Sequence, residues 1–586
     1  MEKISRKSFV KGALGLGAVG ILAGCASSAS STAASASSTA APAEKKEFTF
    51  ADTVRWDAQY DVVVMGMGAA GMVAAKTAAD NGAKVVIVEK CEEGKAGGNT
   101  KVCGQLFAYA NGDKDAAKSY YTALAGGRDI EPEIIDAISE GVANMADILA
   151  DEFGFNKDEY MDWTGVNVSG TNMGAMSPEY PEMPGHEKMA LWTTHAGASD
   201  GYLYQGLKQN VTDRVDAIDV WYSSPAKSLI QDPVTKTVVG VTVERDGKEM
   251  NIRALNGVCI CTGGFECNKE MVQHYLNVIN YAPRGGQFNT GDGIKMAQAV
   301  GADLWHMDCY EGLFGLGSVT YPVEEGIPCD MIATLAQNAV NTGAAILVGT
   351  DGDRFVNESE TVRHGHLYEN GIWENPTFPE KVWYIIDETQ KGEIEAAGAM
   401  PEEQLAKLTA YDSIDALAEG IGVDKDRLTK TIKNYNSFAN NGEDYKCGRE
   451  AQYMRAFDGK KYYAMYMVSG LLNTQGGPKR SALRFWTPRA APSRTCTPPV
   501  SAAALPCACI RAAPTLPSAS PSAALPARTP QRSRTHCPPT LWRLWSLRPH
   551  SPVTSTIWSA RKKPTRLLTT STSARHRVWT MRSWSV

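Results

Sequence analysis

Residues 61–90 combine an apolar strand, a G-x-G-x-x-G turn, an Ala-rich helix and a second apolar strand that ends in an acid. In such a unit Gly66 permits a tight turn, Gly68 lets the backbone approach a pyrophosphate, and Gly71 lets the helix pack closely on the strand. The phosphates sit at the helix N-terminus because its unpaired N–H groups attract anions, and Glu89 lies where a carboxylate binds ribose hydroxyls. The unit therefore predicts a doubly wound α/β domain that binds a dinucleotide.

Three further turns of small residues follow this unit. GGNT at 97–100 comes directly after the second strand, where backbone can lie along the pyrophosphate and ring of a flavin dinucleotide. TGG at 262–264 ends another strand, and NTGDG at 289–293 opens a helical stretch, so a carboxylate and backbone amides again stand at a helix start. Each turn alone is compatible with an ordinary loop, but the four in this order favour FAD over NAD.

At this point the chain resembles a known family. The segments GMGAAG, GGNT, TGGFECN, NTGDGIKMA, DGDRFVNE and NTQGGPK are similar to those of the fumarate reductase and succinate dehydrogenase flavoprotein family. The resemblance is to its soluble, exported, flavocytochrome c-like branch, which includes urocanate and other ene reductases and has ketosteroid dehydrogenases as relatives. It covers about residues 55–480, and its motifs are specific as a set.

The resemblance implies a fold and an activity. The expected architecture is an FAD-binding, Rossmann-like domain at 55–312, an inserted α+β capping domain at 313–470, and a return to the FAD domain at 471–480. The implied enzyme is an FAD-dependent oxidoreductase acting on CH–CH groups, with hydride passing from flavin N5 to an activated C=C bond. The cofactor-binding residues that we expect are Gly66, Gly68, Ala69, Ala70, Gly71, Glu89, Lys90, Gly97, Gly98, Asn99, Thr100, Ala226, Thr262, Gly263, Gly264 and Asp292.

The chain departs from the fumarate-specific members of this family on the substrate side. Their proton-donating arginine falls at Val362, and Arg363 stands one place later. A dicarboxylate needs several cationic or hydrogen-bonding groups, because a buried unpaired charge is very costly. The chain therefore predicts a different electron-poor alkene, with Arg363 as the candidate catalytic acid or else a surface arginine. The positions of the other charged or histidine residues of that branch are taken here by Leu313, Asn338, Asn341 and Asn473.

Four other side chains have weaker claims to a role. His195, in LWTTHAGASDG, lies in a stretch that resembles the family's substrate-side loop, although a lone histidine is more often a hydrogen-bonded structural residue. If the resemblance holds, His306 and Tyr310 face the junction between the two domains. The alternative is that they serve only as packing residues. Glu358 is expected to order the capping loop.

The N-terminal segment predicts export. Lys3, Arg6, Lys7 and Lys11 flank a short apolar run, and LAGC ends it at Cys25 as a lipobox does. We expect a lipoprotein signal peptide at 1–25, a Ser/Ala-rich tether at 26–54, and a lipid on Cys25 that anchors the protein to the outer face of the cytoplasmic membrane. SRKSFVK resembles a twin-arginine (Tat) signal, while the ordinary secretory route and a disordered leader remain alternatives.

The cysteines and the charge pattern add less. Cys259, Cys261 and Cys267 have neither zinc nor iron–sulfur spacing, so we interpret them as buried strand cysteines and predict no metal site. No C-x-x-C-H haem motif is present, so electrons are expected from another protein. The resemblance implies that the donor is a membrane quinol chain or a small flavin or haem carrier, as in anaerobic respiration. No basic stripe before residue 480 indicates nucleic acid.

Residues 481–586 differ from the rest of the chain. They contain no Gly, Asp, Glu, Asn or Tyr, but 16 Arg and Lys, 15 Pro and six Trp. The net charge is −22 over residues 1–480 and +16 over the tail. A folded α/β domain needs glycine at turns and helix ends. We therefore expect no folding here and interpret the tail as an alternate reading frame entered near codon 480, or else as a genuine disordered basic tail.

Two functional hypotheses follow. The first is an exported FAD-dependent ene reductase, for a small organic acceptor other than fumarate. The second is a C-terminally damaged, inactive remnant or a non-catalytic flavin-binding lipoprotein. The resemblance implies a final strand and a Gly-rich helix start after residue 480, and the tail has neither. Without them the flavin ring would lose one wall, so we expect the chain as written to bind FAD poorly or not at all.

Overall fold

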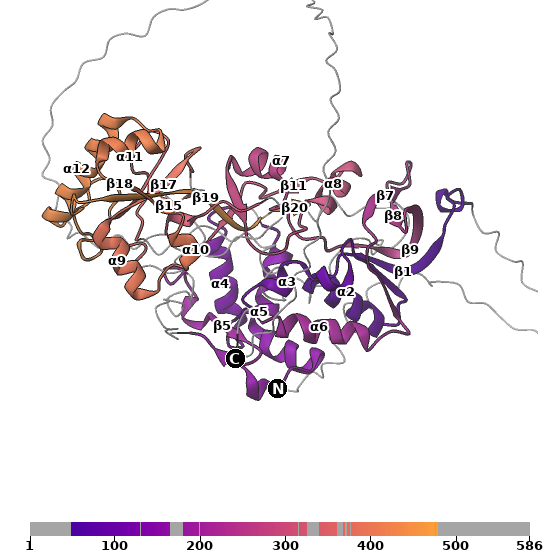
Figure 1. Ribbon diagram of the computed structural model, residues 1–586. Coiled ribbons are helices and arrows are strands. Elements are labelled where there is room, and N and C mark those ends of the chain that lie inside the picture. Colours follow the sequence, from indigo (N-terminus) through magenta and orange to yellow (C-terminus); the bar gives the residue numbers. More distant parts are fainter. Residues whose placement is uncertain are drawn as a thin grey trace, which may run out of the picture. The chain divides into compact units, whose positions relative to one another are not determined.

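A computed structural model describes the part of the chain in which the glycine turns occur (Figure 1). The signal peptide, Cys25, the candidate acid Arg363, Val362 and Asn338 and the tail lie outside the described residues, as does the tether up to residue 47. Among the described helices, none is long and apolar enough to cross a bilayer. The described residues are 48–478 without 129, 165–179, 198–199, 314–315, 325–338, 360–366, 370–371, 375–376 and 475.

A six-stranded sheet forms the centre of the first half of the chain. Its order is β6-β2-β1-β9-β8-β7, in which β6, β2, β1 and β9 run parallel and β7, β8 and β9 form an antiparallel meander. Val-rich strands suit this position, because the inner strands of a parallel sheet are covered on both faces. The strands are β1 (Ala58–Met65), β2 (Val85–Val88), β6 (Ile218–Trp221), β7 (Ala226–Gln231), β8 (Val238–Arg245) and β9 (Lys248–Ile260).

Helices cover both faces of this sheet, as its alternating side chains require. Val64 packs in a core with α2 (Ala69–Asp80), α5 (Pro132–Phe153) and α6 (Tyr202–Thr212). Its neighbour Val63 points to the other face and packs in a separate core with α8 (Asp292–Ala299). The expected doubly wound α/β fold is confirmed.

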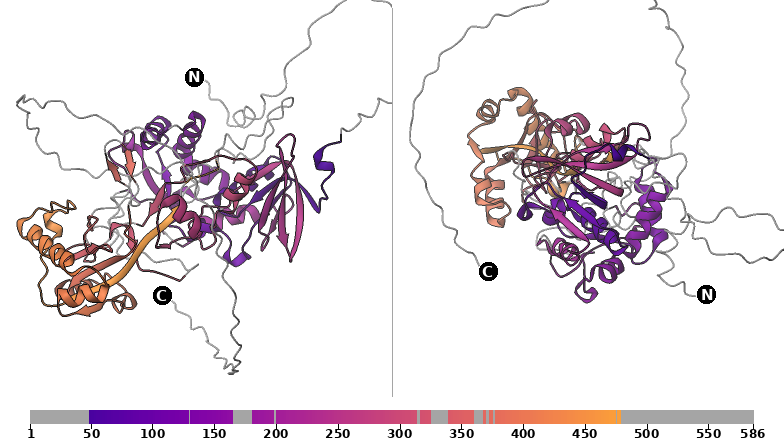
Figure 2. Two further views of the ribbon diagram at one scale, coloured as in Figure 1. Left: turned by 90° about the horizontal axis from the view of Figure 1, so that it is seen from above. Right: turned by 90° about the vertical axis from the view of Figure 1, so that its right-hand side faces the viewer.

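A second sheet is organised around β19 (Tyr462–Thr474), a 13-residue strand. The first part of β19 pairs with β17 and β18, and its last part pairs with β10, β12 and β13. The strand is the long orange arrow in the left view of Figure 2. The strand therefore runs across residue 470, the expected end of the capping domain, and joins that region to the cofactor-binding part. The partners are β10 (Tyr281–Pro283), β12 (Tyr310–Gly312), β13 (Val319–Thr320), β14 (Ala345–Val348), β17 (Val382–Asp387) and β18 (Thr409–Tyr411).

The helices of residues 388–441 pack on this second sheet. α11 (Ile414–Ile421) and α12 (Lys425–Asn441) share a core with β14 and β17, and α9 (Glu388–Ala397) packs in the core on the sheet's other face. The remaining helices are α3 (Gly98–Val102), α4 (Lys114–Leu124), α7 (Lys269–Met271), α10 (Glu402–Leu405), a π-turn at Val272–Leu276, and 3-10 turns at Phe50–Asp52, Glu93–Lys95, Lys157–Glu159, His186–Lys188, Leu316–Ser318 and Ala451–Tyr453. The remaining strands are β3 (Phe107–Tyr109), β4 (Met161–Asp162), β5 (Ala190–Thr193), β11 (Leu304–Trp305), β15 (Leu367–Glu369), β16 (Ile372–Glu374) and β20 (Gly477–Pro478).

Candidate functional site

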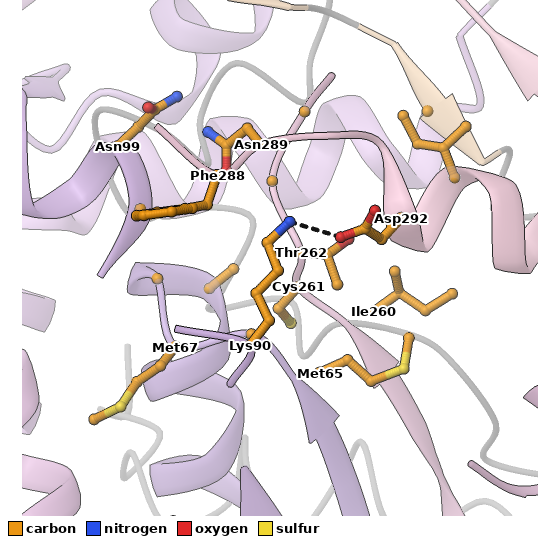
Figure 3. A pocket seen from close by; sticks show the side chains of 18 of the residues that line it. Met65, Met67, Lys90, Asn99, Ile260, Cys261, Thr262, Phe288, Asn289 and Asp292 are labelled. Atoms are coloured by element: carbon orange, nitrogen blue, oxygen red, sulfur yellow. Dashed lines mark hydrogen bonds and ion pairs between the residues drawn. The ribbon is translucent and has the colours of Figure 1, made fainter. Parts of the chain in front are cut away.

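One pocket collects the four glycine turns at the carboxyl ends of β1, β2 and β9 (Figure 3). Fourteen of the sixteen expected cofactor-binding residues line it, and the other two, Gly71 and Gly97, support its walls. The carboxyl edge of a doubly wound sheet is where such folds bind ligands. Segments from Met65 to Pro478, more than 400 residues apart in the sequence, therefore converge on one site.

The first turn is built from two glycines that touch. Gly66 has φ +97°, and a Cβ added to it would lie 2.4 Å from the carbonyl oxygen of Cys261. A Cβ added to Gly71 would lie 1.9 Å from the carbonyl oxygen of Gly66. Both contacts are with backbone, which cannot move aside. The turn thus brings the N-terminus of α2 close to the sheet, where its first two residues, Ala69 and Ala70, line the pocket.

Glu89, at the end of β2, is fixed by backbone donors. Its Oε2 accepts from the N–H of Met67 at 2.8 Å and its Oε1 accepts from the N–H of Cys91 at 2.9 Å. The side chain is buried. The carboxylate therefore stands at the pocket wall in one orientation, with unused lone pairs for the ribose hydroxyls that the motif predicts.

We expect Glu89→Gln to weaken FAD binding by about tenfold. The amide that replaces one carboxylate oxygen places a donor against a backbone N–H, and an unsatisfied buried donor costs about 1–3 kcal/mol. Fluorescence titration of the purified protein with FAD measures the change. Glu244→Gln, on an exposed ion pair with Lys227, is the matched control. An unchanged dissociation constant in Glu89→Gln would remove Glu89 from the site.

Thr100 and Lys90 fasten neighbouring turns together. The Thr100 hydroxyl accepts from the N–H of Ala69, the first residue of α2, at 2.9 Å. Lys90 reaches across the pocket and lies 2.7 Å from Asp292 Oδ2 and 2.8 Å from Thr290 Oγ1 (Figure 3). The end of β2 is in this way linked to the start of α8.

Sequence reasoning missed several residues that line the pocket, and Glu266 is the most informative. It follows the TGGF turn, and its side chain is fully buried. Burial raises the pKa of its carboxyl, against the hydrogen bonds that it accepts. A carboxylate next to a glycine turn was the available signal, but its partners come from distant segments. The other missed lining residues include Met67, Cys91, Pro225, Phe288, Asn289, Thr474 and Gly476–Pro478.

Most of the weaker candidates lie away from the pocket lining. His195 Nε2 is 2.6 Å from Asp200 Oδ2, and the ring stacks on Tyr202 at 4.2 Å between centroids. The Tyr310 hydroxyl donates to the carbonyl of Gly470 at 2.5 Å inside an apolar core. His306 Nδ1 lies 2.9 Å from Arg128 Nη1. These contacts are those of structural residues.

The substrate-side positions separate into two groups. Asn473 lines the pocket and its Oδ1 accepts from Asn99. Leu313 is buried in an apolar cluster, and Asn341 is buried with its carbonyl accepting from Arg449.

The cysteines of the third turn differ from the expectation. Cys259, Cys261 and Cys267 are half-buried rather than fully buried, and Cys261 lines the pocket. Cys259 lies in β9, whereas Cys261 and Cys267 follow the strand. Within residues 48–478, as far as they are described, no cluster of three or more His, Cys, Asp or Glu side chains is arranged to hold a metal ion.

Glu358 belongs to a buried group of four charges in the region expected to be the cap. Arg354 holds Glu358 with two hydrogen bonds, of 3.0 and 2.6 Å, and Asp444 with one of 2.9 Å. Arg449 Nη1 lies 3.4 Å from Glu358 Oε2, and all four side chains are buried. Glu358 also accepts from the N–H of Leu347 in β14, so this charged cluster fastens the loop after β14 to the second sheet.

Comparison with known proteins gives a consistent result. A family model described as "FAD binding domain" matches residues 61–479. The chain is 28% identical over 433 residues to an "NADH:fumarate oxidoreductase" of Klebsiella pneumoniae, covering 71% of this chain but 41% of that protein. It is 27% identical over 511 residues to a "3-oxosteroid 1-dehydrogenase" of Mycobacterium tuberculosis, covering 72% of this chain and 88% of that one.

A solved structure shows the same fold. It is a 3-ketosteroid Δ1-dehydrogenase from Sterolibacterium denitrificans, with a TM-score of 0.56 and 19% identity. The match covers 78% of this chain and 98% of that protein. At this identity the likeness concerns the fold alone.

Proposed function

The chain belongs to the FAD binding domain family, and from this premise we propose that it is an FAD-dependent oxidoreductase that reduces an activated C=C bond of a small organic acceptor. The observation that carries the proposal is the convergence of fourteen expected FAD residues on one pocket. The pocket suits FAD because Gly68 and Gly98 line it without side chains, and because Glu89 and the start of α2 offer an acceptor and donors. Bound FAD supplies hydride transfer.

Different residues of the chain bind different parts of the cofactor and fix its orientation. The glycine turns and the N-terminus of α2 receive the pyrophosphate, and Glu89 receives the adenosine ribose. The ion pair of Lys90 with Asp292 holds the end of β2 next to the start of α8. Arg363, five residues after the anchored Glu358, is our candidate for the group that delivers a proton to the acceptor.

The acceptor that we propose is less charged than fumarate. Two carboxylates need cationic partners, and asparagines occupy positions 338, 341 and 473. We further propose that the protein is exported and anchored by lipid at Cys25 on the outer face of the cytoplasmic membrane. Electrons then reach it from a quinol chain or a small flavin or haem carrier. The leader sequence and the absence of a haem motif from the sequence support this part of the proposal.

Reoxidation by alkenes tests the function. The FAD-loaded chain is reduced anaerobically with dithionite and mixed with cinnamate, urocanate, an enone or fumarate. We expect reoxidation by at least one of the first three acceptors and little by fumarate. Arg363→Ala should slow reoxidation about 10²- to 10⁴-fold with FAD affinity unchanged, while Arg55→Ala, a change at an exposed arginine, should not. Bound FAD that no alkene reoxidises would contradict the enzyme proposal.

The composition of residues 481–586 favours a second candidate, a damaged remnant that holds FAD only loosely. The tail has no glycine for the turns of a closing segment. Resequencing the coding DNA across codons 470–490 decides between the two. An inserted or missing base that restores a Gly-rich continuation supports the reductase, and a confirmed shift supports the remnant.

A further inference from the structure

Glu266 gathers neutral donors from distant parts of the chain. Its Oε1 accepts from Asn99 Nδ2 at 2.8 Å and from Asn289 Nδ2 at 2.6 Å, and its Oε2 accepts from the Thr474 hydroxyl at 3.0 Å. Asn99 lies in the first turn of α3, Asn289 precedes α8, and Thr474 ends β19. One carboxylate therefore connects three walls of the pocket.

Asn99 extends this network around the pocket. Its Oδ1 accepts from the N–H of Gly286 at 2.5 Å, and its Nδ2 also donates to Asn473 Oδ1 at 2.8 Å. Figure 3 shows Asn99 and Asn289 on one side of the pocket, away from Asp292. Because Glu89 serves the adenosine ribose, the Asn99 side is the one that remains for the flavin half.

The charge on Glu266 lacks a cationic partner of the kind that two other buried carboxylates have. Glu358 pairs with Arg354, and Asp387 pairs with Arg455 at 2.8 Å. Across the described residues no ion pair within 4 Å involves Glu266. Burial raises the pKa of Glu266 while its hydrogen bonds act in the opposite sense. Such a group can be neutralised only by a proton.

The ionisable groups around Glu266 do not supply that compensation. Cys267, its neighbour on the same turn, has a pKa of about 12, raised by its own burial and then by the Glu266 charge. Lys90, from the end of β2, is engaged with Asp292 of α8. The groups that α3 and β19 present to Glu266 are the amide of Asn99 and the hydroxyl of Thr474, which are neutral.

We propose that Glu266 positions Asn99 and Asn289 at the flavin half of the pocket and takes up one proton when the bound FAD is reduced. The inference rests on the assigned cofactor and does not depend on alkene reduction. An external reductant such as dithionite supplies two electrons to the flavin. The Glu266 carboxylate takes one proton from solvent and becomes a carboxylic acid, because added negative charge beside a buried carboxylate favours its protonated form.

The test is the pH dependence of the midpoint potential of bound FAD, measured with mediator dyes at saturating FAD. In the wild-type protein we expect a pH interval in which the potential falls more steeply than in Glu266→Gln. The extra slope corresponds to one tenfold change per pH unit, or about 30 mV for a two-electron couple. Gln keeps an acceptor for both asparagine amides and can donate to Thr474, so positioning survives while proton uptake is lost. Glu419→Gln, which removes an exposed charge on α11, should keep the wild-type slope.

Each outcome decides the inference. Equal slopes in wild-type and Glu266→Gln would overturn it. If Glu266→Gln binds no FAD, the redox-induced infrared difference spectrum of the wild-type protein decides instead. A carboxylic acid C=O band that appears on reduction supports the inference, and its absence overturns it. If no alkene reoxidises the protein, only the proposed alkene reduction is contradicted. If the chain binds no FAD, both the cofactor site and the proposed role of Glu266 are contradicted.

Discussion

Gly71→Ala is expected to weaken FAD binding about 10- to 100-fold, although alanine is the better helix former. The added Cβ would lie 1.9 Å from the carbonyl oxygen and 3.0 Å from the carbonyl carbon of Gly66. Gly66 is itself confined, because it holds φ +97° and a Cβ added to it would meet the backbone of Cys261 at 2.4 Å. Displacing α2 costs about 1–3 kcal/mol and moves the N–H groups that receive the pyrophosphate. Fluorescence titration with FAD measures the loss.

Gly392→Ala is the matched control, since Gly392 is also inside a helix, α9. A Cβ there meets nothing within 4 Å. Alanine should therefore raise the free energy of unfolding by up to about 1 kcal/mol, and FAD affinity should not change. If Gly71→Ala bound FAD as tightly as the wild-type protein, the close packing of α2 on the first turn would not be what holds the cofactor.

Arg354→Met is expected to lower the free energy of unfolding by about 3–5 kcal/mol. The change leaves Asp444 and one edge of Glu358 without their guanidinium partner in a buried site, and an uncompensated buried charge is strongly destabilising. Urea unfolding followed by circular dichroism measures the effect. Arg427→Met removes an exposed arginine 3.3 Å from Asp351, and this control should cost about 1 kcal/mol or less.

The same variant should change the acid stability of the protein. Burial opposes ionisation of Asp444, but the charge of Arg354 prevails and holds the pKa of that carboxyl below its usual value. A group with a depressed pKa adds stability above its unfolded pKa, and that stability is lost as the pH falls through the folded pKa. Arg354→Met should therefore flatten the loss of stability below about pH 4. A steep acid limb that is unchanged in the variant would contradict the role given to this pair.

The cofactor-binding turns could be predicted from the sequence because the residues that define each turn are close together in the chain. Gly66, Gly68 and Gly71 act within one strand–turn–helix unit, and Glu89 follows on the next strand. The structure confirms the α/β fold and brings fourteen of the sixteen expected FAD residues to one pocket.

What sequence reasoning missed depends on distant contacts. Glu266 looks like an ordinary acid beside a turn until Asn99 and Thr474 are folded against it, from 167 and 208 residues away. In the charged cluster, the i, i+4 pair of Arg354 and Glu358 is visible in the sequence. Its partner Asp444 is 90 residues further on, and neither hydrophobic period nor turn chemistry signals it.

Direct titration of the full-length chain with FAD tests the central claim, that the pocket at the carboxyl ends of β1, β2 and β9 is an FAD site. We predict saturable binding of one FAD per chain, with the low affinity expected of a chain whose tail supplies no Gly-rich closing segment. Binding should be weakened further in Gly71→Ala and Glu89→Gln and unchanged in Gly392→Ala. A chain that binds no FAD at saturating concentration, or that binds it equally well in all three variants, would contradict the account.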